Sequence, residues 1–313
     1  MAATRRATSR CTGLLRGLTT RIAVALAVLV ISGLLAATLV RMAPGFGMDE
    51  RMLDVRLSAA SLQSIQRQGA GQSNILQYYW QYLRQLSHGD FGVSLSSGRP
   101  VRDLLAERLG LSLRSAFAGL GLAWMLALAA VIVLEMSQRK LNEAVAAILT
   151  GTILCTPAAL VALACVYIGA APGAAIAVIV FPRIFRYVRD LVRHASAAPH
   201  VLTAHALGLH PLRILGCHVV PPVLPEMLAL GGISVSMAMG ALVPVEALCD
   251  SPGVGQLVWQ AAMARDLPVL VNVTLLLAAF TIGANLLADT ALSARLPVLG
   301  DVRNGEVRNE VQA

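Results

Sequence analysis

The chain has 313 residues, of which 57% are hydrophobic and only 13% are charged. A soluble domain of this length needs far more polar surface, so the composition excludes an ordinary soluble protein and favours a helical membrane domain. The formal net charge of +8 does not indicate a nucleic-acid partner, because the arginines are spread along the chain and no basic domain carries them.

Five long stretches without a charged side chain predict the membrane-crossing segments. In chain order they are residues 22–40, 115–134, 144–182, 227–245 and 267–288. The hydrocarbon core of a bilayer is about 30 Å thick and needs about 20 helical residues. The third stretch is about twice that length, and its centre reads Gly169-Ala-Ala-Pro172-Gly173, a turn signal that predicts a hairpin. The sequence therefore predicts an all-α polytopic membrane protein with six transmembrane helices.

Polar segments between these stretches predict the domain organisation. It comprises a basic cytoplasmic segment at 1–21, a first transmembrane helix at 22–42, an extracytoplasmic insert at 43–111, a transmembrane core at 112–293 and a cytoplasmic tail at 294–313. Within the insert, the run beginning at Pro100 predicts a separate short helix. With the amino terminus inside, the short external loops contain Arg265 as their only basic residue, so the excess of Lys and Arg on the other side predicts that both termini are cytoplasmic.

The sequence contains no recognisable catalytic constellation. It has no GxxxxGK phosphate-binding motif, no HExxH or CxxC metal pair and no GxSxG motif. Five histidines cluster in sequence, at positions His194, His200, His205, His210 and His218. Their spacings of five, six and eight put no pair one helical turn apart, which favours solvated or interface histidines over a metal site. We therefore predict a transport subunit that is not an enzyme and holds no metal.

The segment at about 194–218, inside the transmembrane core, is predicted to be cytoplasmic and to contain two short helices. The first begins near Pro199 and ends at Gly208, and the second begins at Pro211 and re-enters the bilayer. A rigid rod held between two spans in this way has the shape needed to transmit motion from a soluble partner.

This segment resembles the coupling loop of the inner-membrane permeases of ABC importers for dipeptides, oligopeptides and nickel complexes, the binding-protein-dependent transport family. The matching residues are Ala204, Ala206, Gly208, Leu209, Arg213, His218 and Pro225. Further segments recur in the family's order: residues 89–94 with 98–109, the pair Arg186 and Arg189, and the run from Glu246 through Pro252, Gly253 and Gly255 to Asp266.

The resemblance implies a type I ABC importer permease fold and a multi-pass subunit of the bacterial inner membrane that carries dipeptides or oligopeptides. The implied partners are a homologous second permease, two nucleotide-binding ATPase subunits, an extracytoplasmic solute-binding protein and membrane lipid, with ATP and Mg bound by the ATPase and no cofactor bound by this chain. Coupling to the ATPase is expected from Ala204, Ala206, Gly208, Leu209, Pro211, Arg213 and His218. An extracytoplasmic loop or gate is expected from Glu246, Pro252, Gly253, Gly255 and Asp266.

Several residues keep two interpretations at the sequence level. Arg186, Arg189 and Arg193 share one helical face, which suits either lipid headgroups or a coupling contact on the cytoplasmic side. The glycines at 253 and 255 suit either a plain turn or a gate. Candidates for the translocation pathway are Glu226, Gly231, Gly232, Ser234 and Ser236. Helix packing explains these small residues as well, and hydration near the cytoplasmic interface explains the glutamate.

The main alternative function is a secondary transporter or channel that needs no ATPase. Such proteins place ionisable ligands or broken helices near the bilayer midplane in both halves, whereas spans one, two, three and six contain no ionisable side chain. A membrane-embedded enzyme would need a nucleophile with a base, or a set of metal ligands, inside the spans, and the sequence offers neither. A purely structural membrane subunit stays open.

Overall fold

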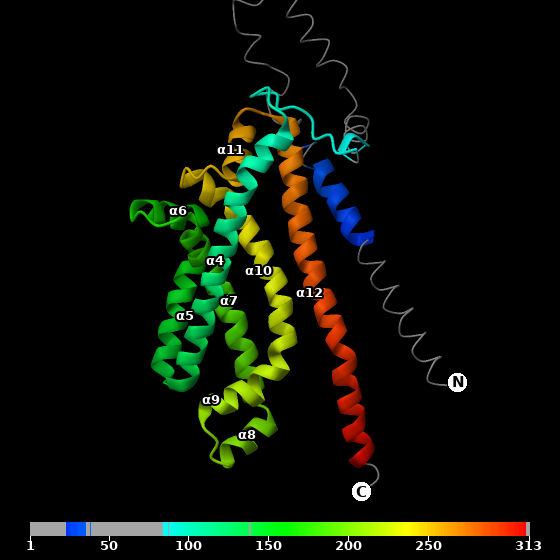
Figure 1. Ribbon diagram of the computed structural model, residues 1–313. Helices are drawn as coiled ribbons and strands as arrows, with labels where there is room; N and C mark the ends of the chain where they lie inside the picture. The colour runs from blue at the N-terminus through cyan, green and yellow to red at the C-terminus, as the bar shows by residue number, and fades with distance from the viewer. Residues whose placement is uncertain (1–22, 36–37, 39–83, 87, 138, 311–313) are drawn as a thin grey trace, which may run out of the picture. The chain divides into compact units, whose positions relative to one another are not determined.

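The computed structural model describes residues 23–35, 38, 84–86, 88–137 and 139–310, with side chains up to residue 290 (Figure 1). The predicted cytoplasmic segment at 1–21 and the part of the predicted insert from residue 43 to residue 83 lie outside the described residues. The chain divides into two compact units, one formed by residues 1–108 and 257–279 and the other by 109–256 and 280–313. Within the described residues the structure is helical, apart from turns and one isolated β-bridge between Val93 and Pro100.

Three described helices are long and apolar enough to cross a membrane. They are α4 (Val101–Ser137), the continuous helical run Pro211–Leu248, which ends in α10 (Val220–Leu248), and the segment Leu267–Thr290 of α12 (Leu267–Glu310). A fourth span is formed if α5 (Lys140–Cys155) and α6 (Ala158–Tyr167) are counted together, although they are bent by 99°. The described part of the first predicted span, Ala23–Leu35, is shorter. The number of six spans and the orientation of the termini therefore stay predictions.

The predicted hairpin in the third apolar stretch coincides with a turn in the structure. α6 ends at Tyr167, Gly169 adopts a φ of 68°, and α7 (Pro172–Ser196) begins with its proline in the first turn. Proline is favoured there because its missing N–H has no helical partner in any case. The bend between α5 and α6 was not predicted; it falls at Pro157, which cannot donate the hydrogen bond that would continue α5.

The prediction of a separate helix near Pro100 is wrong. α4 begins at Val101 and continues without a break to Ser137, so the predicted short helix is the first turns of a long one. Residues such as Leu104, Glu107 and Arg108 are good helix formers, and the stretch from Val101 to Leu109 contains neither Gly nor Pro. The polar residues before residue 115 mark the edge of the predicted membrane span, but the helix itself extends through them to Val101.

The first unit is held by apolar packing and by one side-chain amide. Leu267, Val271 and Leu275 of α12 form a buried cluster against Leu29, Leu34 and Leu86. Asn272 Nδ2 donates to the carbonyl of Phe91 at 2.7 Å and to that of Pro268 at 2.8 Å. The loop before α4 is thereby tied to α12.

α7 is the central helix of the second unit. It packs against α5, α6 and α10, and its residues Ile176, Val180, Ile184 and Val188 are completely buried. α4 approaches α7 closely at Gly119, where an added Cβ would lie 2.5 Å from the carbonyl oxygen of Gly173 and 2.9 Å from Cβ of Ile176. Small residues allow such close contact between helices in a membrane, where packing replaces the hydrophobic effect as the driving force.

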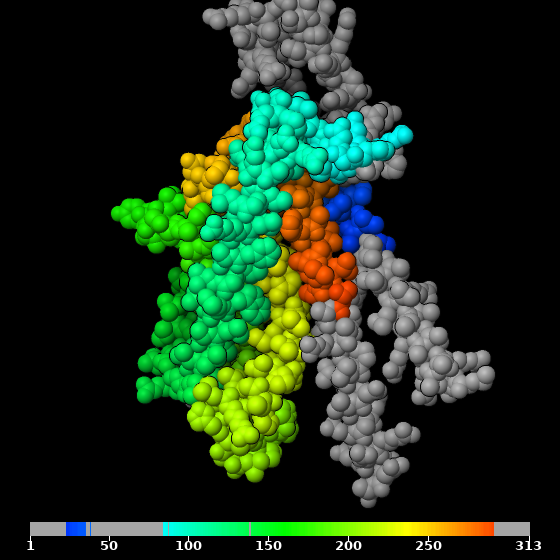
Figure 2. All heavy atoms as spheres, in the orientation of Figure 1, coloured from blue at the N-terminus to red at the C-terminus, as the bar shows by residue number. Residues whose placement is uncertain are grey.

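α10 is joined to its preceding helices by a wide helical turn. After α8 (Pro199–Ala206) and α9 (Pro211–Ile214), residues Leu215–Val219 form a π-helix, and α10 follows directly. Prolines at 221, 222 and 225 lie near the start of α10, where their missing N–H groups disturb the helical hydrogen bonds, and the π-turn lies immediately before them. We call residues 199–214 the elbow; in the space-filling view it protrudes beyond the end of α5 (Figure 2).

The contact between α4 and α7 gives a stability prediction. Gly119→Ala should lower the stability of the detergent-solubilised protein by about 1–3 kcal/mol, the usual cost of overpacking, because backbone atoms of α7 cannot move aside. Gly121→Ala is the matched control, since no atom lies within 4 Å of its added Cβ and alanine is the better helix former. Thermal unfolding of both variants measures the difference, and equal melting temperatures would contradict the close approach.

Candidate functional site

A buried carboxylate lies at the end of α10. The sequence placed Glu246 in the loop after the fifth span, but α10 continues to Leu248 and Glu246 is completely buried on its last turn. Pro244 precedes it inside the same helix without ending it. The boundary is therefore corrected: the glutamate belongs to the helix, and the loop begins after it.

Glu246 joins α4, α10 and the start of α11 (Val254–Met263) through hydrogen bonds. Its Oε2 accepts from Ser112 Oγ at 2.9 Å and from the Gly255 N–H at 2.7 Å, and its Oε1 accepts from Ser115 Oγ at 3.3 Å. Ser112 Oγ in turn accepts from the Val254 N–H at 2.7 Å. All these partners donate through neutral groups, and together they hold the start of α11 against α4 and α10.

Both glycines of the following loop lie against this carboxylate. A Cβ on Gly253 would overlap the carboxyl group of Glu246, and one on Gly255 would lie 2.7 Å from the carbonyl oxygen of Leu242 and 2.9 Å from Cα of Val243. Neither residue has a positive φ, so it is close approach that requires glycine here. A plain turn would not by itself require glycine at positions 253 and 255, whereas this close approach does. Pro252 beside them is exposed.

The first unit contains a second buried carboxylate. Asp266 is completely buried, and its Oδ2 accepts from Ser94 Oγ at 2.5 Å, from Ser96 Oγ at 2.8 Å and from the Ser96 N–H at 3.1 Å. Its Oδ1 accepts from the Val269 N–H at 3.4 Å, so the same side chain caps the start of α12. Asp266 thus connects the segment before α4 to the helix that follows α11.

Cys249 follows α10 directly and is half-buried. Burial is the main cause that raises the pKa of its thiol, and the neighbouring Cys165 and Glu246 act in the same direction. The thiol therefore stays protonated near neutral pH and is a poor nucleophile.

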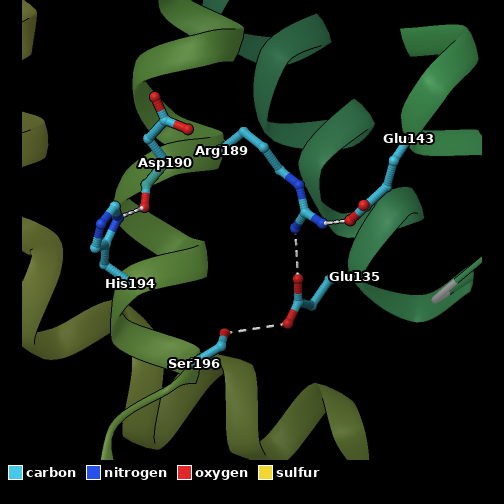
Figure 3. Close-up of polar contacts among 6 residues, drawn as sticks. All are labelled: Glu135, Glu143, Arg189, Asp190, His194 and Ser196. Carbon is cyan, nitrogen blue, oxygen red and sulfur yellow. Dashed lines mark hydrogen bonds and ion pairs between the residues drawn. The ribbon is translucent and has the colours of Figure 1, made fainter. Parts of the chain in front are cut away.

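At the opposite end of the helices, Arg189 of α7 is paired with two glutamates (Figure 3). Its Nη1 lies 2.6 Å from Glu135 Oε2 on α4, and its Nη2 contacts Glu143 Oε1 on α5. Ser196 Oγ donates to the other oxygen of Glu135 at 3.1 Å. The sequence left a lipid anchor or a coupling contact open for this arginine, whereas the structure pairs it within the chain. Arg186 and Arg193 remain exposed.

The elbow has the conformation that its glycine and prolines predict. α8 ends in a Schellman motif: Gly208 has a φ of 71°, its N–H donates to the carbonyl of His205, and the N–H of Leu209 donates to that of Ala204. Pro211 opens α9, and Nδ1 of His210 accepts from the Leu212 N–H at 3.4 Å.

Residues of the elbow divide into an inner and an outer set. Ala204 and Ile214 are buried, and His218 of the π-helix is half-buried, with its carbonyl 3.3 Å from Nε2 of His200. The exposed set includes three leucines, Leu202 at 61%, Leu207 at 74% and Leu212 at 50%. The other exposed residues are Pro199, His200, Thr203, His205, Ala206, Gly208, His210, Pro211 and Arg213. The elbow therefore presents a mixed surface, in which exposed leucines alternate with histidines and one arginine.

Small residues of α10 pack against neighbouring helices. A Cβ on Gly232 would lie 2.6 Å from Cβ of Ala288 in α12. Ser234 Oγ accepts from Trp124 Nε1 at 3.0 Å, and Ser236 Oγ accepts from Asn285 Nδ2 at 3.2 Å. This arrangement favours the helix-packing interpretation for these three residues. Gly231 has open space around its Cα, and Glu226 is exposed.

Sequence reasoning missed the partners of each charged group. These are Ser112 and Ser115 for Glu246, Ser94 and Ser96 for Asp266, and Glu135 and Glu143 for Arg189. Two serines three residues apart at the start of an apolar helix were a usable signal, because both lie on one helical face. The pairing itself has no local signature, since Ser112 and Glu246 are 134 residues apart.

Comparison with known proteins decides the family. Residues 132–294 match the family described as "Binding-protein-dependent transport system inner membrane component". The chain belongs to this family. It is therefore a multi-pass membrane permease, the inner-membrane component of a binding-protein-dependent transport system, and the resemblance noted in the sequence is confirmed.

Curated relatives of the permease extend over most of its length. The nickel import system permease protein NikB of Staphylococcus aureus is 23% identical over 280 residues, covering 84% of this chain and 85% of the relative. The oligopeptide transport system permease protein OppB of Escherichia coli is 28% identical over 229 residues, covering 66% and 74%. A putative peptide permease protein of Brucella ovis is 23% identical over 301 residues, covering 87% and 94%.

The Glu246 cluster gives a double-mutant prediction. Gly253→Ala should destabilise the wild-type permease by about 1–3 kcal/mol but cost much less in a Glu246→Ala background, because the overlapping carboxyl group is then gone. Gly255→Ala is the comparison and should lose less of its cost in that background, since its Cβ would meet backbone atoms of Leu242 at 2.7 Å and Val243 at 2.9 Å, which remain, as well as Glu246 Oε2 at 3.0 Å. Thermal unfolding of the four variants and their parents measures both couplings; equal couplings would show that the carboxylate does not set the position of the loop.

The Arg189 ion pairs give a second prediction for the permease. Arg189→Gln should destabilise the protein by about 1–2 kcal/mol because it leaves two glutamates without their cation, although partial exposure of Glu143 reduces the effect. Arg193→Gln, one turn further along α7 and exposed, should change stability by less than about 0.5 kcal/mol. Chemical denaturation in detergent compares the two, and a larger loss for Arg193→Gln would refute the assignment.

Proposed function

We propose that this permease is one transmembrane subunit of an ATP-driven ABC importer for dipeptides or oligopeptides, or for a metal complex of similar size. The observation that carries the proposal is the elbow of this binding-protein-dependent permease: two short helices joined by a Schellman turn expose three leucines and run directly into a long span. The chain forms half of the translocation pathway and hydrolyses no ATP itself. The names of its relatives, which include oligopeptide and nickel import permeases, support this choice of solutes.

In this proposal the elbow faces the cytoplasm and seats in a groove of one ATPase subunit. The Schellman turn at Gly208 fixes the angle between α8 and α9, so the two short helices move as one piece. Exposed Leu202, Leu207 and Leu212 supply the apolar contact, and Arg213 supplies a charge beside it. Nucleotide-driven closure of the ATPase would displace the elbow and, through the π-helix, α10.

At the other end of the helices, the proposal assigns the Glu246 and Asp266 clusters to the extracytoplasmic side. Glu246 holds the Pro252–Gly255 loop onto α10, and a binding protein would dock on this loop and on the insert before α4. Six spans, cytoplasmic termini, a second homologous permease and two ATPase subunits complete the assembly. The two access states need to differ by only a few kcal/mol for hydrolysis to shift their populations.

Substitutions at the elbow test the proposal. Gly208→Trp should abolish ATP-dependent uptake without preventing membrane insertion, because tryptophan strains the turn at its φ of 71° and the indole would project from the exposed turn into the partner. Gly208→Asn is the matched control, since asparagine tolerates a positive φ and adds little bulk. The measurements are solute uptake in cells and the amount of ATPase subunit that co-purifies with each variant.

Opposite outcomes separate this proposal from a transporter that needs no ATPase. Loss of both uptake and co-purification in Gly208→Trp, with Gly208→Asn near the wild type, supports an ATPase seated on the elbow. Full uptake by the purified permease without any ATPase subunit would favour a secondary transporter or channel and refute the proposal.

A further inference from the structure

α7 carries a polar stripe along one side of its second half. The stripe consists of Arg183, Arg186, Tyr187, Asp190, Arg193 and His194, and all six residues are exposed. At 100° per residue they cover about a third of the helix circumference. The opposite side carries Ile184, Val188 and Val192, which are buried against the rest of the unit. Figure 3 shows Asp190 and His194 on one side of α7 and the Arg189 ion pairs on another.

The stripe is too long to be explained by headgroup contact at the helix end. Arg183 and His194 are separated by about 16 Å along the axis, which is about half the thickness of the hydrocarbon core. In the proposed topology α7 is the fourth span, so residues near its end can extend their side chains to the headgroups, whereas Arg183 lies about three turns further in. Charged side chains at such depth face water or protein in membrane proteins, because exposure to lipid tails is costly.

The charge of the stripe is unbalanced. Three arginines against one aspartate leave a net charge of +2 with His194 neutral. Arg189, on the neighbouring face, is neutralised by Glu135 and Glu143. Arg183, Arg186 and Arg193 form no ion pair with any residue in the described part of the chain. Glutamates of α4 and α5 thus neutralise Arg189, whereas the other three arginines of α7 can pair with an external anion.

The composition of the stripe favours a hydrated surface over a protein interface. The centre of a protein interface is poor in charged residues and rich in apolar contacts. Here Tyr187 is the only large side chain that is not readily charged, and five of the six residues are ionisable. A water-filled pathway accepts such a surface at no desolvation cost.

We propose that the α7 stripe lines the inner half of the solute pathway and binds the carboxylate of the transported solute through Arg183 and Arg186. The inference deepens the proposed function and rests on it, because it assumes that this chain conducts a solute. A guanidinium matches a carboxylate in shape and charge, and its pKa keeps it charged at any physiological pH. A bare divalent cation would be repelled, so a metal ion would pass only inside an anionic chelate. The shared ligand chemistry is thus a carboxylate, carried by a peptide or by a chelator.

The first test asks whether the stripe faces water. Tyr187→Cys should react with a hydrophilic, membrane-impermeant thiol reagent added to the cytoplasmic side of inverted vesicles, over the background of the native cysteines. Leu149→Cys is the control, because Leu149 is exposed at 60% on the apolar helix α5 and should face lipid. If Tyr187→Cys reacts no faster than Leu149→Cys, the stripe faces lipid or protein and the inference is wrong.

The second test asks whether the stripe recognises a carboxylate. Uptake of a peptide with a free carboxyl terminus is compared with uptake of the same peptide as its amide, in the complete importer with its binding protein. The ratio of the two uptake rates should fall about three- to fivefold in Arg183→Gln/Arg186→Gln, the size expected for an exposed ion pair, and recover in Arg183→Lys/Arg186→Lys. The binding protein is the same in every variant, so its own preference cancels from the comparison.

Arg114→Gln provides the matched charge control, because it removes one exposed arginine from α4, outside the stripe, and should leave the ratio unchanged. A citrate-bound metal ion serves as the second anionic solute. If the stripe variants lose uptake of the peptide, the stripe binds a peptide carboxylate; if they lose uptake of the metal citrate, it binds a chelator carboxylate. Equal loss of the acid and the amide would refute carboxylate binding while leaving the proposed function intact. Absence of ATP-dependent uptake of all solutes by the wild type would refute the proposed function, and the inference with it.

Discussion

The carboxylate of Glu246 is the constraint on which the geometry at the end of α10 depends. It accepts hydrogen bonds from α4 through Ser112 and Ser115 and from the first turn of α11 through Gly255. A buried acceptor that lost these donors would cost several kcal/mol, so the three elements are held together or must separate together. Asp266 repeats the same principle in the other unit with Ser94 and Ser96, using a carboxylate, serine donors and a helix start.

Charge is used differently at the two ends of the second unit. At the end of α10 a lone carboxylate is satisfied by neutral donors, which fixes a tight loop that only glycine can form. At the end of α7, Arg189 bridges glutamates from α4 and α5, which fixes the relative positions of three long helices beside the elbow. α4 and α7 are further joined by the close approach at Gly119. In the proposed function, these contacts would let the bundle pass a displacement of the elbow on as a rigid movement.

How much of this could be predicted from the sequence depends on the range of each interaction. Apolar runs identified α10, the first part of α12 and the turn at Gly169, because these signals are local. Helix ends were misplaced at Val101 and Leu248, since polar composition marks the edge of a membrane but does not stop a helix whose residues favour it. The partners of Glu246 and Arg189 could not be predicted, because those side chains come from segments far away in the sequence. Glycines 253 and 255 were predicted as turn or gate residues, and the close approach that requires glycine at both positions could not be predicted, because it depends on the neighbouring Glu246.

The π-turn Leu215–Val219 sets the rotational phase between the elbow and α10. A π-turn accommodates one residue more than an α-helical turn, and one residue corresponds to a rotation of about 100°. Removing a single residue from this turn would leave both helices intact yet aim the tip of the elbow in a different direction. In the proposed complex, the contact between the elbow and an ATPase subunit would therefore be sensitive to insertions and deletions in a five-residue stretch that itself need touch no partner.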